Sequence, residues 1–250
     1  MNRNLNQAQA VFPHLFHASR PRPCPYLSGR FERTVVVGLM GPDAAELYHA
    51  GSKAGFRRSH NVLYRPACHD CDACIPVRVV VGDFEATPSL RRVIKANRGL
   101  RAIDNPFGAT AEQYALFRRY QTTRHANGGM HDMDFESYRA MVEDSPVATK
   151  LVEFRDPEDV LVGAMLTDRL DDGLSAIYSF FDPALGKRSL GTYMVTWLIG
   201  RAKQRGLDYV YLGYWIADCA KMSYKMRFRP LEALVKDGWR PRHVPPNTSE

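Results

Sequence analysis

The stretch LSAIYSFFDPALGKRSLGTYMVTWLIGRAKQRGLDYVYL, residues 174–212, predicts a strand, a helix and a second strand in succession. Residues 174–181 are rich in aromatic and apolar side chains, which is typical of a strand. Ser189 is placed to cap a helix over Leu190–Gln204, and Arg205-Gly206 terminates that helix. The run Asp208–Leu212 then predicts the second strand.

The flanking sequence extends this unit into a larger sheet. Strands are expected at Lys150–Phe154 and Val160–Leu166, with a hairpin turn at Asp171-Asp172-Gly173, and a last strand is expected at Pro230–Val235. A short helix is expected at Cys219–Phe228. This order indicates an α+β fold with a mixed sheet. It is similar to the acetyltransferase-like (GNAT) fold, which holds an acyl donor where two central strands splay apart.

The sequence pattern of the amino-terminal part differs from that of the rest of the chain and predicts a separate domain. Strands are expected at Thr34–Leu39 and Pro76–Val81, followed by a helix from Pro88 to about Leu100. The turn cluster Asn105–Thr110 is the best boundary, and helices are expected after it at about 111–125 and after Asp134. We therefore expect a smaller, basic, cysteine-containing α+β domain over residues 1–104, a catalytic domain over 105–236 and an irregular tail over 237–250.

Composition and charge limit the classes of function. Of 250 residues, 45% are hydrophobic and 24% charged, which excludes a disordered or fibrous chain. No apolar run approaches the roughly 20 residues of a membrane span, and no secretory signal is readable, so a cytoplasmic protein without a membrane partner is expected. The net charge of +7 lies in residues 1–100, which carry 14 basic and 7 acidic side chains. This surplus favours a nucleic acid partner, although a solvated basic face would look the same.

A cysteine cluster follows the first predicted strand. Cys68, Cys71 and Cys74 are spaced by two residues each, and Cys24 is a fourth candidate from the earlier segment. Thiolates at such gaps can converge on a zinc ion or an iron–sulfur cluster. The alternative is a set of small buried thiols around a tight turn.

Eight longer stretches, read in order, resemble one family. They are CPYLSGR (24–30), AGFRRS (54–59), YRPACHDCDACIPVR (64–78), RHANGGMHDM (124–133), YSFFDP (178–183), RSLGTY (188–193), YLGYWI (211–216) and KMSYKMRFRP (221–230). Over residues 12–236 they are similar to the arginyl-tRNA–protein transferase family, specifically its bacterial aspartate/glutamate leucyltransferase branch. The chain departs from the family pattern between Phe84 and Arg92.

The resemblance implies a concrete reaction. Such enzymes transfer leucine from Leu-tRNA to proteins whose first residue is Asp or Glu, which marks those proteins for degradation by the N-degron (N-end rule) route. The implied partners are Leu-tRNA and acidic protein amino termini, with no DNA. The donor ester is already activated, so transfer requires no cofactor.

Aminolysis of an ester needs a group that accepts a proton from the attacking amine and others that position it. Asp182, at the end of the strand 174–181, is the first candidate, and Tyr178 and Tyr214 are possible relay groups. The alternatives are that Asp182-Pro183 is only a turn and that both tyrosines are core aromatics.

Cations must read the two substrates. Arginine pairs bidentately with a carboxylate, so the candidates for the acceptor side chain are Arg57, Arg58, Arg65 and Arg78. For the tRNA, the candidates are Arg188 and Gly191 at a helix start, together with Lys221 and Lys225 on the short helix expected at 219–228 and Arg229, which extends their face. Arg91, Lys95 and Arg98 offer a second stripe.

Three other functions remain open from the sequence. Arginine in place of leucine would suit the eukaryotic branch of the same family. An acetyl-coenzyme A-dependent N-acetyltransferase would share the fold, but the bulky Tyr193 stands where the pyrophosphate would lie. A metal-bearing RNA-binding module without catalysis would use the cysteines and the basic segment alone.

Overall fold

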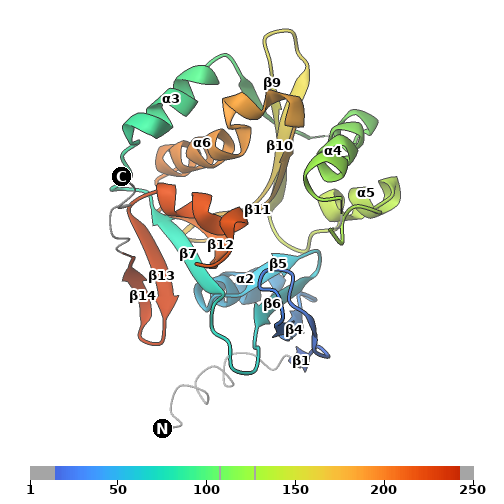
Figure 1. Cartoon of the computed structure of the whole chain (residues 1–250), viewed down its shortest axis with the longest axis vertical. Helices are drawn as coiled ribbons and strands as arrows, with labels where there is room; N and C mark the ends of the chain where they lie inside the picture. Colours follow the sequence, from blue (N-terminus) through green and yellow to red (C-terminus); the bar gives the residue numbers. More distant parts are fainter. Residues whose placement is uncertain (1–14, 107, 127, 243–250) are drawn as a thin grey trace.

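An eight-stranded mixed sheet runs through the molecule (Figure 1). The computed structural model describes residues 15–106, 108–126 and 128–242. In sheet order, the strands are β14 (Gly238–Pro241), β13 (Leu231–Val235), β7 (Ile75–Val80), β12 (Tyr209–Trp215), β11 (Gly173–Phe181), β10 (Leu161–Arg169), β9 (Thr149–Arg155) and β8 (Arg101–Asp104). Only the pair β11–β12 is parallel among the described pairs of this sheet. The predicted mixed α+β fold is confirmed.

Helices cover both faces of this sheet. On one face lie α6 (Leu190–Gln204) and α3 (Pro88–Ala96), and on the other lie α4 (Ala111–Arg124) and α5 (Phe135–Glu143). Side chains alternate along a strand, so β9 sends Val152 and Phe154 into the core under α6 and Leu151 into the core under α4. The central strands are therefore apolar on both faces.

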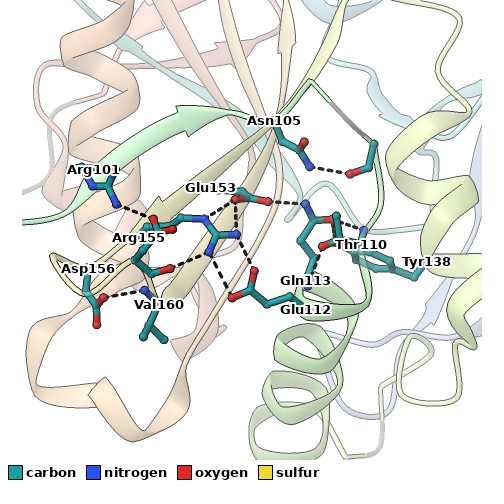
Figure 2. A network of polar contacts seen from close by, with 12 residues as sticks. Arg101, Asn105, Thr110, Glu112, Gln113, Tyr138, Glu153, Arg155, Asp156 and Val160 are labelled. Carbon is teal, nitrogen blue, oxygen red and sulfur yellow. Dashed lines mark hydrogen bonds and ion pairs between the residues drawn. The ribbon is translucent and has the colours of Figure 1, made fainter.

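A polar network holds α4 against the sheet (Figure 2). Gln113 donates from Nε2 to Oε1 of Glu153 over 2.6 Å, and its Oε1 accepts from the Tyr138 hydroxyl over 3.2 Å. Arg155 joins Oε2 of Glu153 at 2.7 Å to Oε2 of Glu112 at 2.6 Å. This network fixes the start of α4 and hence the direction in which its later side chains reach β11.

A small antiparallel sheet packs below the large one in Figure 1. Its strands are β1 (His17–Ala18), β4 (Thr34–Gly38), β6 (Val62–Pro66) and β5 (Arg57–Ser59), accompanied by α2 (Ala44–Lys53) and by the pair β2 (Arg22–Pro23) and β3 (Phe31–Glu32). A third apolar core joins Tyr48 of α2 and Leu63 of β6 to Tyr211 of β12. The small sheet thereby delivers the first residue of β5 to the centre of the large sheet.

Several boundaries differ from the sequence predictions. The helix 190–204 has the predicted limits, but Ser189 lies in the left-handed region with φ 52° and makes no side-chain capping bond. The start of the tail, predicted to be irregular, forms β14, because residues 238–241 pair with β13; residues 243–250 lie outside the described residues. The helix α2 and the strands β5, β6 and β8 were not predicted.

The predicted boundary between the two domains can be compared with the strand order of the large sheet. β7 comes from the amino-terminal part of the chain, yet it lies between β12 and β13 of the carboxy-terminal part. A boundary near residue 104 stays a prediction. Within the described ranges, no helix combines the length and apolarity needed to cross a membrane.

Candidate active site

The strands β11 and β12 diverge at the centre of the large sheet. They pair only over Gly173, Leu174 and Ser175, opposite Tyr209, Val210 and Tyr211. Beyond that point, the pairing of β12 with β7 shifts register between Tyr211 and Gly213, and Gly213 has a φ of +76°. Glycine is the residue that adopts this conformation without steric cost, so the sequence itself allows β12 to turn away from β11 here.

The side chain of Arg57 occupies the gap between the two strands. Its Nη2 donates to the carbonyl oxygens of Ala176 at 3.0 Å and Ile177 at 3.1 Å, both on β11. A Cβ atom on Gly213 would lie 1.7 Å from Nη1 of Arg57, so only glycine leaves room for the guanidinium. Arg57 therefore satisfies main-chain acceptors that the divergence of the strands leaves without a partner on β12.

Lys225 lies beside Arg57 and is buried. It belongs to the 3₁₀ helix η2 (Ala220–Arg227) and is only 6% exposed. Its Nζ donates to the carbonyl oxygen of Tyr214 on β12. Burial, and then the positive charge of Arg57, lower the pKa of Lys225 from its ordinary value to about 7. Within the described residues, neither Lys225 nor Arg57 forms an ion pair with a carboxylate.

The predicted phosphate stripe on this helix is wrong for Lys225. An α-helix would bring residues 221, 225 and 229 close to one face, but a 3₁₀ helix aligns residues three apart. Lys225 consequently shares a face with the fully buried Phe228, whereas Lys221 and Arg229 stay exposed. Arg229 donates from Nε to the carbonyl oxygen of Met226 at 3.1 Å.

Two of the other candidate arginines form buried structural pairs. Arg58 is 3% exposed and donates to both carboxylate oxygens of Asp168, at 2.6 and 2.8 Å. Its Nη1 also donates to the main-chain carbonyl oxygen of His60. Arg78 binds Glu232 at 2.8 Å and lies 3.4 Å from the ring centroid of Tyr209. Neither guanidinium faces solvent, so neither fits the predicted contact with an acceptor carboxylate.

Arg65 is exposed and lies near the same region. Its Nη1 donates to the carbonyl oxygen of Ala54 at 2.9 Å. Burial raises the pKa of the Tyr214 hydroxyl, and the positive charge of Arg65 lowers it by a smaller amount. Arg65 and Arg57 are thus the two candidate arginines that the structure leaves without a carboxylate partner in the described residues.

Tyr178 and Asp182 lie along the divergent end of β11. The Tyr178 hydroxyl accepts from Nε2 of the buried Gln121 at 2.5 Å, and burial raises its pKa. The Asp182 carboxylate accepts from the main-chain N–H of Ala184 at 2.9 Å and lies 3.9 Å from Nη2 of Arg119. Asp182 thus caps η1 (Pro183–Arg188) while its side chain stays partly exposed.

Tyr214 is buried and turned toward the small sheet. Its hydroxyl lies 3.0 Å from the carbonyl oxygen of Gly55 and 3.1 Å from that of Tyr64. These contacts join β12 to the small sheet, which suits a structural role as well as a relay.

The start of α6 is held by α3. Arg188 donates from Nε to Oδ1 of Asn97 at 3.1 Å and from Nη2 to the carbonyl oxygen of Ala96 at 3.3 Å. A Cβ atom on Gly191 would lie 3.1 Å from the Phe181 ring, so this glycine allows close packing of α6 on β11. The charged side chains of the second predicted stripe, Arg91, Lys95 and Arg98, are exposed on or just after α3.

Four residues near the site were not singled out from the sequence. They are Arg119, Gln121, Arg124 and Gly213. Burial, then the charges of Lys221 on η2 and Arg124 on α4, lower the pKa of His125. Arg124 lies in the family stretch RHANGGMHDM and Gly213 in YLGYWI, and this is the sequence signal that could have identified them.

Cys68, Cys71 and Cys74 lie in the segment between β6 and β7, and Cys24, which follows β2, comes near them. Burial raises the pKa of the Cys74 thiol to about 12, and its neighbours Cys68, Cys24 and Cys71 add to this. All four are half-buried free thiols. In the part of the chain that the structure describes, no three Cys, His, Asp or Glu side chains are arranged to hold a metal ion.

Comparison with known proteins gives the class first. Residues 22–92 match the family described as "Arginine-tRNA-protein transferase, N terminus", and residues 112–235 match its C terminus. A solved structure described as FemX is 8% identical, with a TM-score of 0.47, over 87% of this chain and 83% of that one.

Curated relatives narrow the class. A protein of Paramagnetospirillum magneticum named aspartate/glutamate leucyltransferase is 56% identical over 91% of this chain and 93% of its own length. One of the same name from Parvibaculum lavamentivorans is 53% identical over 94% of this chain and 97% of its own. The chain therefore belongs to the aspartate/glutamate leucyltransferase family of transferase enzymes, as its sequence motifs predict.

Proposed function

We propose that this enzyme transfers leucine from Leu-tRNA to the amino terminus of proteins that begin with Asp or Glu, and thereby marks them for N-degron degradation in the cytoplasm. The names of the relatives support the leucyl donor and the acidic acceptor. The observation that carries the proposal is the cation of Arg57, placed where β11 and β12 diverge and without a carboxylate partner in the described residues. A half-buried positive charge of this kind favours an anionic ligand.

We infer an acetyltransferase-like catalytic unit for this reaction. The single parallel pair β11–β12, which separates after three residue pairs, supports an acyl donor bound at that divergence. Tyr193 is 8% exposed and packs against Phe154, so it is part of the core at the start of α6. The cysteine-containing amino-terminal unit supplies Arg57 and Arg65 to the same region.

The chemistry is aminolysis of the aminoacyl ester by the acceptor's α-amine. This amine has an ordinary pKa of about 7.7–8.0, so much of it must lose a proton before it attacks. Asp182 follows the divergent end of β11 and is the proposed group that orients the amine and accepts its proton, and the hydroxyl of Tyr178 on β11 is the proposed relay. The new amide forms as the ester bond to the tRNA ribose breaks, and the leaving ribose oxygen takes up a proton.

The tRNA is proposed to lie over exposed cations from three elements. Lys221 lies in η2 and Arg229 follows it, and Arg124 is the last residue of α4; the charges of Lys221 and Arg124 both act on His125. Such contacts position the nucleic acid without reading its sequence. Arg188 contributes through the start of α6, where it is already hydrogen-bonded to α3.

The transfer itself needs no cofactor, because the donor ester is activated. Zinc or an iron–sulfur cluster at Cys24, Cys68, Cys71 and Cys74 remains a hypothesis, and no step above depends on it. Elemental analysis of the purified protein tests it: stoichiometric zinc or iron would support the site, and a metal-free, fully active enzyme would remove it.

A transfer assay tests the proposed function. Leu-tRNA and Arg-tRNA are offered separately, with peptides that begin with Asp, Glu, Lys or Ala. We expect a labelled product only with leucine and an acidic first residue, and none after ribonuclease digestion of the tRNA. Transfer of arginine, or equal use of the Ala peptide, would contradict the proposed donor or acceptor.

A further inference from the structure

A half-buried guanidinium and a buried amine, those of Arg57 and Lys225, lie together where β11 and β12 diverge. Lys225 donates to the carbonyl oxygen of Tyr214, and the preceding residue, Gly213, packs against the Arg57 guanidinium, whose charge lowers the pKa of the Lys225 amine. The side chains of Lys225 and Arg57 donate hydrogen bonds to main-chain carbonyl oxygens, of Tyr214 and of Ala176 and Ile177 respectively. The site thus holds a guanidinium and an amine of lowered pKa and, in the described residues, no carboxylate paired with either.

The other buried arginines of the described chain show how this differs from ordinary structural pairing. Arg58 is paired with Asp168, and Arg78 with Glu232. Both pairs follow the rule that a buried charge is compensated by an opposite one. Arg57 departs from this pattern, because its half-buried guanidinium has no carboxylate partner among the described residues, so the site can accept an anion that the chain itself does not supply.

Two exposed tyrosines feel the same charge. Tyr26 is 37% exposed and Tyr224 is 39% exposed. Burial raises the pKa of both hydroxyls and the charge of Arg57 lowers it, so both hydroxyls lie within electrostatic reach of the guanidinium. Arg57 is itself half-buried, so part of its side chain is accessible from the surface.

We propose that Lys225 and Arg57 together bind the side-chain carboxylate of the acceptor's first residue, with one carboxylate oxygen on each cation. This inference rests on the proposed function and gives Lys225 a part in recognising the acidic side chain of the acceptor. Arg57 is held in place by β11, and Lys225 is held by the main chain of β12. The carboxylate would therefore bridge the two strands that diverge.

The ionisation of Lys225 explains how such a site rejects neutral residues. With a pKa of about 7, set by burial and by Arg57, the free amine is readily neutral. A carboxylate beside it favours the protonated form, so binding of Asp or Glu takes up a proton, whereas the isosteric Asn cannot do this. Cys219, which raises this pKa slightly, is the other titratable group that acts on Lys225.

The first experiment measures acceptor selectivity in the Lys225→Met variant. The ratio of kcat/KM for a peptide beginning with Asp to that for one beginning with Asn is expected to fall about 10- to 100-fold, as for loss of a charge-assisted hydrogen bond. Lys203→Met, on the exposed carboxy-terminal end of α6, is the matched control and should keep the ratio. An unchanged ratio, or an equal loss of kcat with both peptides, would overturn the inference.

Thermal unfolding of the same variant distinguishes the proposed role of Lys225 from a purely structural one, because the two roles predict different changes in melting temperature. Replacing an unpaired buried amine by methionine removes a desolvation cost, so the melting temperature should stay the same or rise. A clear fall would mean that Lys225 serves chiefly to hold Tyr214, against the proposal.

The second experiment needs no tRNA and separates this inference from the proposed function. The side-chain resonance of Lys225 is followed by NMR against pH, with and without the Asp peptide or the Asn peptide. We expect the Asp peptide alone to raise the pKa of Lys225. If no leucine transfer is found but this shift occurs, the proposed function fails and the carboxylate site stands. If transfer is found without the shift, the site is wrong.

Discussion

Arg57 and Arg58 are neighbours in the sequence and have opposite environments. Successive side chains of a strand point to opposite faces, so β5 directs Arg57 into the gap between β11 and β12 and Arg58 onto the buried Asp168. The sequence stretch AGFRRS marks both as family residues, but it does not tell which one is paired. The difference is decided by an acid 110 positions away on another strand.

Substitution of Arg58 is predicted to affect stability rather than substrate choice. Arg58→Met leaves the buried Asp168 charge unpaired, which should cost about 3–5 kcal/mol of unfolding free energy. The double variant Arg58→Met with Asp168→Leu removes both charges and should recover much of that loss. Denaturant unfolding measures both variants. Full stability of the single variant, or a selective loss of acidic acceptors, would show that Arg58 has been misassigned.

Gly213 is predicted to be required for the position of Arg57. In Gly213→Ala the new methyl group would overlap Nη1 of Arg57 and place alanine at a φ of +76°. The strain should cost about 1–3 kcal/mol and displace the guanidinium from β11. Gly200→Ala on α6 is the control, because nothing lies within 4 Å of its Cβ position and alanine favours a helix. Equal unfolding midpoints and acceptor KM values for the two variants would contradict this reading of Gly213.

At the scale of elements, the sequence predicts long periodic segments well and short ones poorly. The helix predicted from Leu190 to about Gln204 is observed over Leu190–Gln204, and the Asp134 cap is confirmed by its bond from the Ser137 N–H at 2.8 Å. The segment 219–228 is helical as predicted, but it is a 3₁₀ helix, and that change of period moves Lys225 from an exposed stripe to the core. No local signal in eight residues separates the two helix types, since tertiary packing decides between them.

The start of α4 offers a test at this scale. Thr110 and Gln113 form a reciprocal capping box, with bonds of 3.2 and 2.9 Å. Thr110→Ala is expected to lower the unfolding free energy by about 1 kcal/mol. Thr123→Ala near the end of the same helix removes only a bond to the Arg119 carbonyl and should change little. Chemical denaturation compares the two, and an equal effect would mean that the capping box does not fix α4.

At the scale of the whole molecule, the central sheet joins distant parts of the chain. β7 at residues 75–80 separates β12 from β13, and the acceptor-side arginines also come from before residue 104. The charge surplus and the family stretches point to the amino-terminal part as functional. They do not reveal that it completes the sheet, because strand order is set by long-range pairing and not by local pattern.

A truncated chain tests this dependence. A fragment that begins at residue 105 lacks β7 and β8 and leaves the edges of β12, β13 and β9 unpaired. Exposed strand edges of this kind favour aggregation, so the fragment is expected to be insoluble or unfolded. Circular dichroism and size-exclusion chromatography are the measurements. A monomeric fragment with a cooperative thermal transition would show instead that residues 105–250 fold as an independent domain.

The central claim is that the gap between β11 and β12 brings a tRNA-borne leucine to an amino terminus recognised by its negative charge. The most direct measurement is the rate of labelled leucine transfer by the wild-type enzyme to two peptides that differ only in Asp or Asn at the first position. The account predicts efficient transfer to the Asp peptide and at least about 100-fold less to its neutral isostere. Equal rates with the two peptides would contradict it.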